Sequence, residues 1–127
     1  MGEKRNPHTV CLKTFKSQSL IAEKCIVAEC FWDRFRGWIG RARVEPGEGL
    51  LFPRCNSVHM WFMRIPIDVV FLKREGGDRY TVTSTRSVRP WRPLPVWDRR
   101  ATETLELPEG TIRRLAIATG ETLCSTN

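Results

Sequence analysis

Short stretches of alternating or continuous apolar residues run along most of the chain, and they predict β-strands. Residues 9–13 and 24–30 are two such stretches near the N-terminus, and the polar residues 16–19 between them suit a turn. Further on, 50–52 and 58–63 show the same character. Strands this short and this closely spaced favour an all-β architecture.

The most strongly β-forming segment is 67–72, which is apolar on both faces apart from Asp68. Such a run is typical of a strand at the centre of a sheet. Glu75-Gly-Gly-Asp78 follows it and predicts a tight turn. We therefore expect 67–72 and 79–85 to form a hairpin.

The spacing of apolar residues changes from that of a strand to that of a helix in two places. Phe31, Phe35, Trp38 and Ile39 fall on one helical face, which predicts two or three turns ending near Gly40. Near the C-terminus, a second short helical stretch follows a turn at 108–110, with Thr111 as its expected cap, and strands are expected at 102–107 and 122–124.

These elements together predict a mostly β fold, a compact antiparallel β-sandwich or partly closed barrel with one or two short helices. The prolines between 88 and 96 exclude a central strand there and favour an extended surface loop. With 127 residues, the chain has room for one core. We expect a flexible N-terminal lead-in at 1–8 and a single β-rich domain at 9–127.

Three blocks and a C-terminal pattern make the chain resemble a known family. The blocks are Arg36-Gly-Trp-Ile-Gly-Arg41, Gly47-Glu-Gly-Leu-Leu-Phe52 and Val58-His-Met-Trp-Phe-Met-Arg-Ile-Pro-Ile-Asp-Val-Val-Phe71, and Leu105-Glu-Leu-Pro-Glu-Gly110 with Thr119-Gly-Glu121 follows them. They resemble domain of unknown function 192, most closely its branch with a Val-His-x-x-Phe-Met-Arg-x-Pro-Ile-Asp-Val-Val-Phe block. The chain departs from the family pattern at Trp38, Ile39 and Glu121. The resemblance implies a mostly antiparallel β fold and no established catalytic activity.

Composition and cysteine content limit the cellular locations and the cofactors that we expect. No apolar run is long enough to span a bilayer, and the first residues lack the apolar segment of a signal peptide, so we expect a cytoplasmic protein. The five cysteines are odd in number and lack Cys-x-x-Cys spacing, which predicts free thiols. The two histidines are not at ligand spacing from each other or from cysteine, so no metal and no other cofactor is expected.

The net charge of +7 comes largely from arginine, and several arginines are interleaved with tryptophan. Such a combination can stack on planar groups and bind phosphate. A solvated basic surface, or the arginine bias of a GC-rich genome, explains the same pattern without a ligand. The residues expected to line a ligand-binding face are Arg36, Arg41, Trp61, Arg64, Asp68, Arg86, Arg89, Trp91 and Arg92.

Asp68 interrupts an apolar strand and admits two interpretations. It can accept hydrogen bonds from buried backbone N–H groups or pair with an arginine, or it can line a pocket beside Trp61 and His59. A small enzyme that uses His59 and Asp68 is therefore an alternative, although no nucleophile is indicated.

The preferred hypothesis is a non-enzymatic binding or accessory module with a basic, Arg/Trp-lined surface. Its expected ligand is anionic, a nucleotide second messenger or an anionic lipid, or else an acidic protein partner binds there. Charge-driven nucleic-acid binding is a further alternative, although no specific motif for it is present. The sequence leaves the oligomeric state and the identity of the ligand open.

Overall fold

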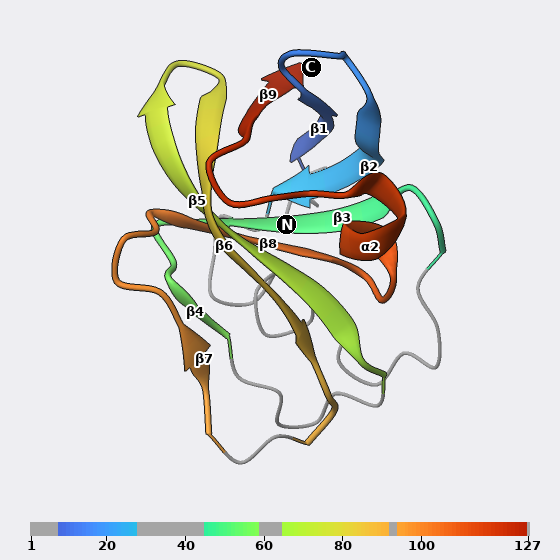
Figure 1. Cartoon of the computed structure of the whole chain (residues 1–127), viewed down its shortest axis with the longest axis vertical. Coiled ribbons are helices and arrows are strands. Elements are labelled where there is room, and N and C mark those ends of the chain that lie inside the picture. Colours follow the sequence, from blue (N-terminus) through green and yellow to red (C-terminus); the bar gives the residue numbers. More distant parts are fainter. Residues whose placement is uncertain (1–7, 28–44, 59–64, 92–93, 127) are drawn as a thin grey trace, which may run out of the picture.

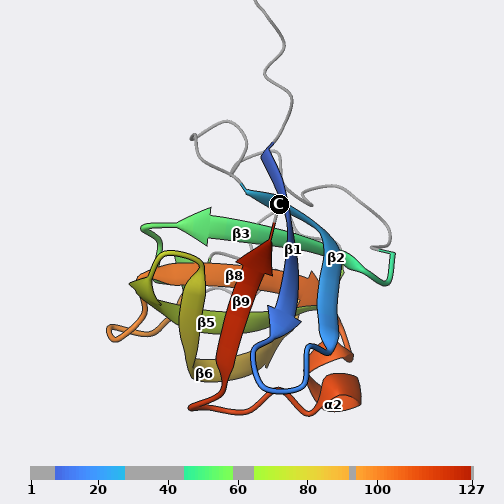
Figure 2. The ribbon, with the colours of Figure 1, turned by 90° about the horizontal axis from the view of Figure 1, so that it is seen from above.

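Seven strands close into a barrel in the computed structural model, which describes residues 8–27, 45–58, 65–91 and 94–126. The order around the barrel is β1-β2-β3-β8-β5-β6-β9, and β9 pairs with β1 to close it (Figures 1 and 2). The strands are β1 (His8–Thr14), β2 (Leu20–Val27), β3 (Glu48–Pro53), β5 (Ile67–Gly76), β6 (Arg79–Val88), β8 (Glu103–Pro108) and β9 (Thr122–Thr126). The predicted mostly β fold is confirmed.

Pairing around the barrel is antiparallel except between β2 and β3, which run parallel. Residues 28–47 separate these two strands, and a parallel pair needs a connection of a dozen residues or more. Gly49 of β3 faces β2 closely here, because a Cβ at this position would lie 3.1 Å from the Cβ of Ala22. The barrel is therefore mixed, and the parallel pair depends on a residue without a side chain.

Two apolar clusters use the two faces of the central strands. Val70 of β5 lies opposite Leu105 of β8, and both belong to the cluster inside the barrel. The neighbouring residues Val69 and Phe71 point the other way, into a second cluster on the outer face. This is why 67–72 is apolar at nearly every position: both faces of β5 are buried.

A small two-stranded sheet lies beside the outer cluster. It pairs β4 (Ser57–Val58) with β7 (Val96–Trp97), below the barrel in Figure 1. Val58 and Val96 are buried in the outer cluster. The proline-rich segment thus forms no central strand, as expected, but it ends in a two-residue strand.

The hairpin predicted from 67–72 and 79–85 is present as β5 and β6, with a bulge in β6. Leu72 lies opposite Val82, and Phe71 lies opposite Ser84, so that Thr83 is the extra residue. Val82 therefore faces the barrel interior while Ser84, two residues on, lies on the outer side with Phe71. A bulge of this kind redirects the side chains that follow it.

One helix, α2 (Thr111–Leu115), is present among the described residues, and it packs against the interior cluster through Ile112 and Leu115. The prediction that Thr111 caps it is wrong. Gly110 occupies the N-cap position without a side-chain cap, and the Thr111 hydroxyl instead donates to the carbonyl of Pro108 at 2.6 Å. The helix predicted at 31–40 and residues 59–63 of the strand predicted at 58–63 lie outside the described residues.

Candidate binding site

A hollow of about 280 Å³ lies on the outer wall of the barrel, between β6 and the turn that follows β7. We call it the arginine hollow. Its lining consists of Ser84, Arg86, Trp97, Asp98, Arg99 and Arg100. Three guanidinium groups and one carboxylate thus surround it, which leaves an excess of positive charge.

Asp98 joins the two sides of the arginine hollow. Its Oδ2 accepts hydrogen bonds from the hydroxyls of Thr83, at 2.7 Å, and Ser84, at 2.6 Å. Its Oδ1 accepts from the backbone N–H of Arg100 at 3.0 Å and from the Nε of the same residue at 3.3 Å. The Asp98 side chain therefore fastens the turn after β7 to the bulge of β6.

These contacts decide the charge of Asp98. Burial acts to raise the pKa of this carboxyl, but the hydrogen bonds from Ser84, Thr83 and Arg100 outweigh burial and hold the pKa well below its usual range. Asp98 is therefore an ionised anchor. It neutralises one of the three arginines and leaves the charge of the others uncompensated.

The remaining groups of the arginine hollow are open to solvent. Arg86 and Arg99 are exposed, and within the described part of the chain neither guanidinium has a hydrogen bond or an ion pair. Arg100 is held, since its Nη2 also donates to the carbonyl of Thr83 at 3.1 Å. The Trp97 side chain is 56% exposed, so its ring is available for stacking.

Arg86, Arg89 and Trp91 are the predicted site residues that lie on or directly after β6, and all three are exposed. Only Arg86 lines the arginine hollow. Trp97, Arg99 and Arg100 complete it. They belong to the stretch in which arginine is interleaved with tryptophan, but they were not among the residues predicted for the site. The signal was present, because two adjacent arginines follow an aspartate and a tryptophan.

Asp68 lies elsewhere, in the barrel wall near α2, and is fully buried. Its Oδ1 accepts a hydrogen bond from the Ser87 hydroxyl at 2.8 Å, and its Oδ2 accepts one from the backbone N–H of Ile112 at 2.9 Å. Asp68 thus ties β5 to both β6 and α2. It points to the same side as Val70 and Leu107, away from the outer face on which the arginine hollow lies.

The other predicted site residues lie outside the described ranges. They are Arg36, Arg41, Trp61, Arg64 and Arg92, and His59 of the alternative enzymatic site lies outside them too.

Glu106 is a buried carboxyl that the sequence analysis did not single out. It lies on the outer face of β8, opposite Leu50 on one side and Val69 on the other. Burial raises the pKa of Glu106 to about 8, and among the described residues no hydrogen bond or ion pair offsets this effect. Its signal in the sequence is the one that drew attention to Asp68: a carboxylate between two apolar residues, Leu105 and Leu107.

The described ranges contain neither a cluster of metal ligands nor a helix that could span a membrane. No group of three or more His, Cys, Asp or Glu side chains there could hold a metal ion. None of the helical residues there forms a segment long and apolar enough to cross a bilayer. Four cysteines are described, Cys11, Cys25, Cys55 and Cys124, and all four are free thiols.

Comparison with known proteins decides the family. The model of the DUF192 family, whose description is "Uncharacterized ACR", matches residues 13–124. The chain belongs to the DUF192 family. This family match agrees with the resemblance in the four sequence segments, and no curated protein matches the chain in sequence.

Two crystal structures resemble this DUF192 chain over nearly its whole length. A Sinorhizobium meliloti 1021 protein, provisionally named a transcription regulator, has 23% identity and a TM-score of 0.78, with 98% of each chain covered. A Novosphingobium aromaticivorans DSM 12444 protein of unknown function has 18% identity and a TM-score of 0.72, with 97% of this chain and 99% of that chain covered. At these identities the similarity shows the fold alone.

Proposed function

We propose that this DUF192 protein is a non-enzymatic binding module, and that the arginine hollow binds the phosphate of a nucleotide. The observation that carries the proposal is the convergence of three guanidinium groups and an exposed indole on one hollow. The proposed site therefore comprises residues of β6 and of the turn after β7.

Arginine chemistry supports a phosphate as the anion. A guanidinium offers a planar fork of N–H donors that matches two phosphate oxygens, and charge-assisted hydrogen bonds of this kind are stronger than neutral ones. Asp98 holds Arg100 in place before any ligand arrives. Arg86 and Arg99 supply charge that no described group compensates.

The size of the hollow and the exposed Trp97 support a nucleotide rather than phosphate alone. About 280 Å³ is small for a whole drug-sized ligand but suits a phosphate with part of a sugar. A base attached to that sugar can stack on the Trp97 ring, with stacking worth about 1–3 kcal/mol per base.

A binding role also fits Asp68 better than the enzymatic alternative does. A general base needs an oxygen available to the reacting proton. Both oxygens of Asp68 accept hydrogen bonds from within the fold, and the side chain is fully buried. We therefore assign Asp68 to the architecture of the barrel.

Isothermal titration calorimetry with mononucleotides and cyclic dinucleotides tests the proposal. The variant Arg86→Gln/Arg99→Gln should weaken nucleotide binding about tenfold or more, since two charge-assisted contacts are lost. The control Arg113→Gln/Arg114→Gln removes the same charge from α2 and should leave binding within about twofold. Trp97→Ala should weaken the binding of nucleotides but should not change the binding of inorganic phosphate.

Three results would contradict the proposal. If Arg86→Gln/Arg99→Gln and Arg113→Gln/Arg114→Gln lose equal affinity for nucleotides, net charge alone attracts the ligand. Nucleosides binding as well as nucleotides would exclude phosphate recognition. Tight binding of oligonucleotides or anionic vesicles, with no binding of mononucleotides, would favour a nucleic acid or a lipid surface instead.

A further inference from the structure

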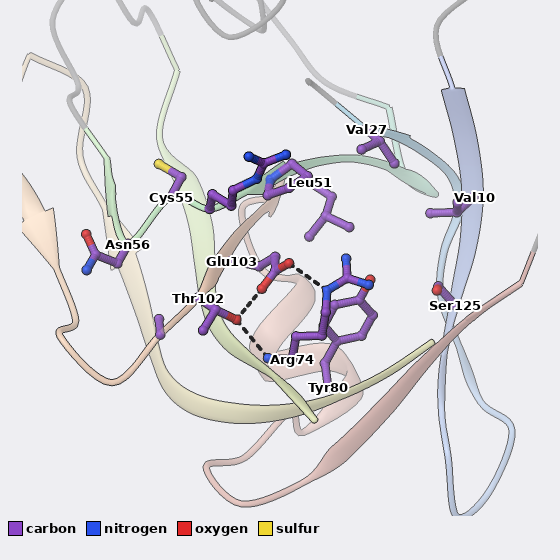
Figure 3. Close-up of a pocket in the computed structure, with 13 residues that line it drawn as sticks. Val10, Val27, Leu51, Cys55, Asn56, Arg74, Tyr80, Thr102, Glu103 and Ser125 are labelled. Carbon is purple, nitrogen blue, oxygen red and sulfur yellow. Dashed lines mark hydrogen bonds and ion pairs between the residues drawn. The ribbon is translucent and has the colours of Figure 1, made fainter. Parts of the chain in front are cut away.

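At the end of the barrel opposite α2, the described residues surround a cavity of about 850 Å³. We call it the barrel mouth. Figure 3 shows that side chains from β1, β2, β3, β5, β6, β8 and β9 reach it, and the turn after β3 forms part of its rim. Its volume lies within the range of sites that bind small molecules. None of its described lining residues also lines the arginine hollow.

One part of the wall of the barrel mouth is apolar, and the rest is polar or charged. Val10, Val27 and Leu51 line it, and all three belong to the apolar cluster that fills the barrel interior. Ala101 lines another part of the wall. Here the interior cluster meets an open space, whereas at the other end it is covered by α2. An apolar wall facing a cavity favours a ligand with an apolar body.

The charged residues on one side of the barrel mouth compensate each other. Glu103 is almost fully buried, and its Oε1 accepts a hydrogen bond from the Nε of Arg74 at 2.9 Å. Its other oxygen accepts from the Thr102 hydroxyl, which in turn accepts from the backbone N–H of Arg74 at 2.8 Å (Figure 3). The Arg74 guanidinium also lies 5.0 Å from the centre of the Tyr80 ring. Glu103 is therefore satisfied, and it leaves no free negative charge for a cationic ligand.

Arg54 on the rim is different. Its side chain is exposed, and within the described part of the chain it has no hydrogen bond or ion pair. Its backbone has φ of +55°, in the left-handed region that most side chains avoid. The turn is held there because the N–H of Cys55 donates to the carbonyl of Thr102, at 3.1 Å, and the Thr104 hydroxyl donates to the carbonyl of Cys55, at 2.6 Å.

We propose that the barrel mouth is a second binding site, which takes a small amphipathic anion. The apolar body packs on Val10, Val27 and Leu51, and the single anionic head, a carboxylate or a phosphate, pairs with Arg54. Since Arg74 and Glu103 compensate each other, Arg54 gives the described lining a net charge of +1. This inference stands on different residues from the nucleotide site and is independent of it.

Titrations with octanoate, octyl phosphate and 1-octanol, each below the concentration at which it forms micelles, test the proposal. The chain length is common to the three probes, so that the head group is the variable. In ¹H–¹⁵N spectra, octanoate or octyl phosphate should shift the amides of Asn56, Tyr80 and Ser125, whereas octanoate should not shift those of Ser84 and Arg86 in the arginine hollow. The anion that binds more tightly identifies the head group, and 1-octanol should bind about tenfold more weakly than that anion.

The matched variants are Arg54→Asn and Arg113→Gln, which removes one exposed charge from α2. Asparagine accepts the left-handed backbone, so Arg54→Asn should keep the turn while it removes the charge. Arg54→Asn should weaken the binding of the preferred anion about tenfold and leave the binding of 1-octanol unchanged, whereas Arg113→Gln should change neither affinity by more than about twofold. Equal affinity for the anions and 1-octanol, unchanged binding in Arg54→Asn, or no binding of any probe would overturn the proposal. None of these results bears on nucleotide binding at the arginine hollow.

Discussion

Asp98 and Glu106 are both 8% exposed, yet their carboxyl groups behave in opposite ways. Hydrogen bonds hold the pKa of Asp98 well below its usual range, in spite of the opposing effect of burial, whereas burial raises the pKa of Glu106 to about 8. The difference lies in the surroundings. Asp98 lies in a turn where hydroxyl and N–H donors converge, and Glu106 lies on a sheet face between Leu50 and Val69. Two carboxyl groups with the same exposed fraction therefore have opposite pKa shifts, because hydrogen-bond donors stabilise the charge of one and an apolar environment disfavours the charge of the other.

The largest expected effect concerns Glu106. Its pKa is about 8 in the folded chain against 4.5 ordinarily, so the folded state holds a proton that the unfolded state releases. Stability should therefore fall by about 1.4 kcal/mol per pH unit as the pH rises from about 4.5 to about 8, and should level off above that. Urea denaturation across this range should show the decline in wild type, and Glu106→Gln should abolish it.

Glu109→Gln is the matched control, because Glu109 is exposed in the turn after β8. It should leave the pH dependence of wild type unchanged. If wild type and Glu106→Gln show the same pH profile, the carboxyl of Glu106 has a compensating partner, and the contrast with Asp98 disappears.

Asp98→Asn should have the next largest effect. It removes the charge and replaces one carboxylate oxygen by an NH2 group, so that either the two hydroxyls or the two N–H groups of Arg100 lose their acceptor; the free energy of unfolding should fall by about 2–4 kcal/mol at pH 7. Because the folded pKa is lowered, the contribution of Asp98 is complete above its ordinary value of 3.8 and is lost as the pH falls below that value. Urea midpoints at pH 7 and in acid check both statements.

Asp78→Asn provides the comparison, since Asp78 is exposed in the turn between β5 and β6. It should change stability by less than about 0.5 kcal/mol. A similarly small change in Asp98→Asn would show that the hydrogen bonds around Asp98 do not anchor the turn after β7.

Much of the fold can be predicted from the local sequence pattern. The features that cannot be predicted in this way depend on contacts between residues far apart in the sequence. The hairpin of β5 and β6 was predicted because its strands and its Gly-Gly turn are contiguous in sequence. The parallel pairing of β2 with β3 was not, because no local pattern records which strand lies beside which. The Thr83 bulge was missed for a similar reason: it depends on register with β5 and on Asp98 from a distant turn.

The candidate site was predicted only in part. Composition indicated arginine and tryptophan, and Arg86 does line the arginine hollow. Sequence could not show that Asp98 draws Arg100 back onto β6, nor that Arg89 and Trp91 would fall outside the hollow. The barrel mouth was not predicted at all. Charged residues that are far apart in the sequence carry no signal that they share a site. Closure of the barrel brings together Arg54, Arg74 and Glu103.

Asp68→Ala extends the comparison to a buried carboxylate with two partners. It should lower the free energy of unfolding by about 1–3 kcal/mol or more, because the N–H of Ile112 and the hydroxyl of Ser87 lose their acceptor. Ser87→Ala removes only one of the two contacts and should therefore lower the free energy of unfolding by less than Asp68→Ala does. An unchanged urea midpoint at constant slope in Asp68→Ala would refute the structural role and return Asp68 to the candidate site residues.

The smallest effect concerns thiol chemistry rather than stability. Cys25 is fully buried, and burial, with a smaller contribution from Cys11, raises the pKa of its thiol to about 12. At pH 8 its thiolate fraction should be about a thousandfold below that of an ordinary cysteine, so Cys25 should react with a disulfide reagent only when the barrel opens. The half-buried thiols Cys11 and Cys55 should react before Cys25 in the native protein. Mass spectrometry of labelled peptides over time resolves the order, and denaturing, non-reducing titration should find five free thiols in all. Fast native labelling of Cys25 would mean that β1 and β2 separate readily, and finding only one free thiol would overturn the expectation of a reduced protein.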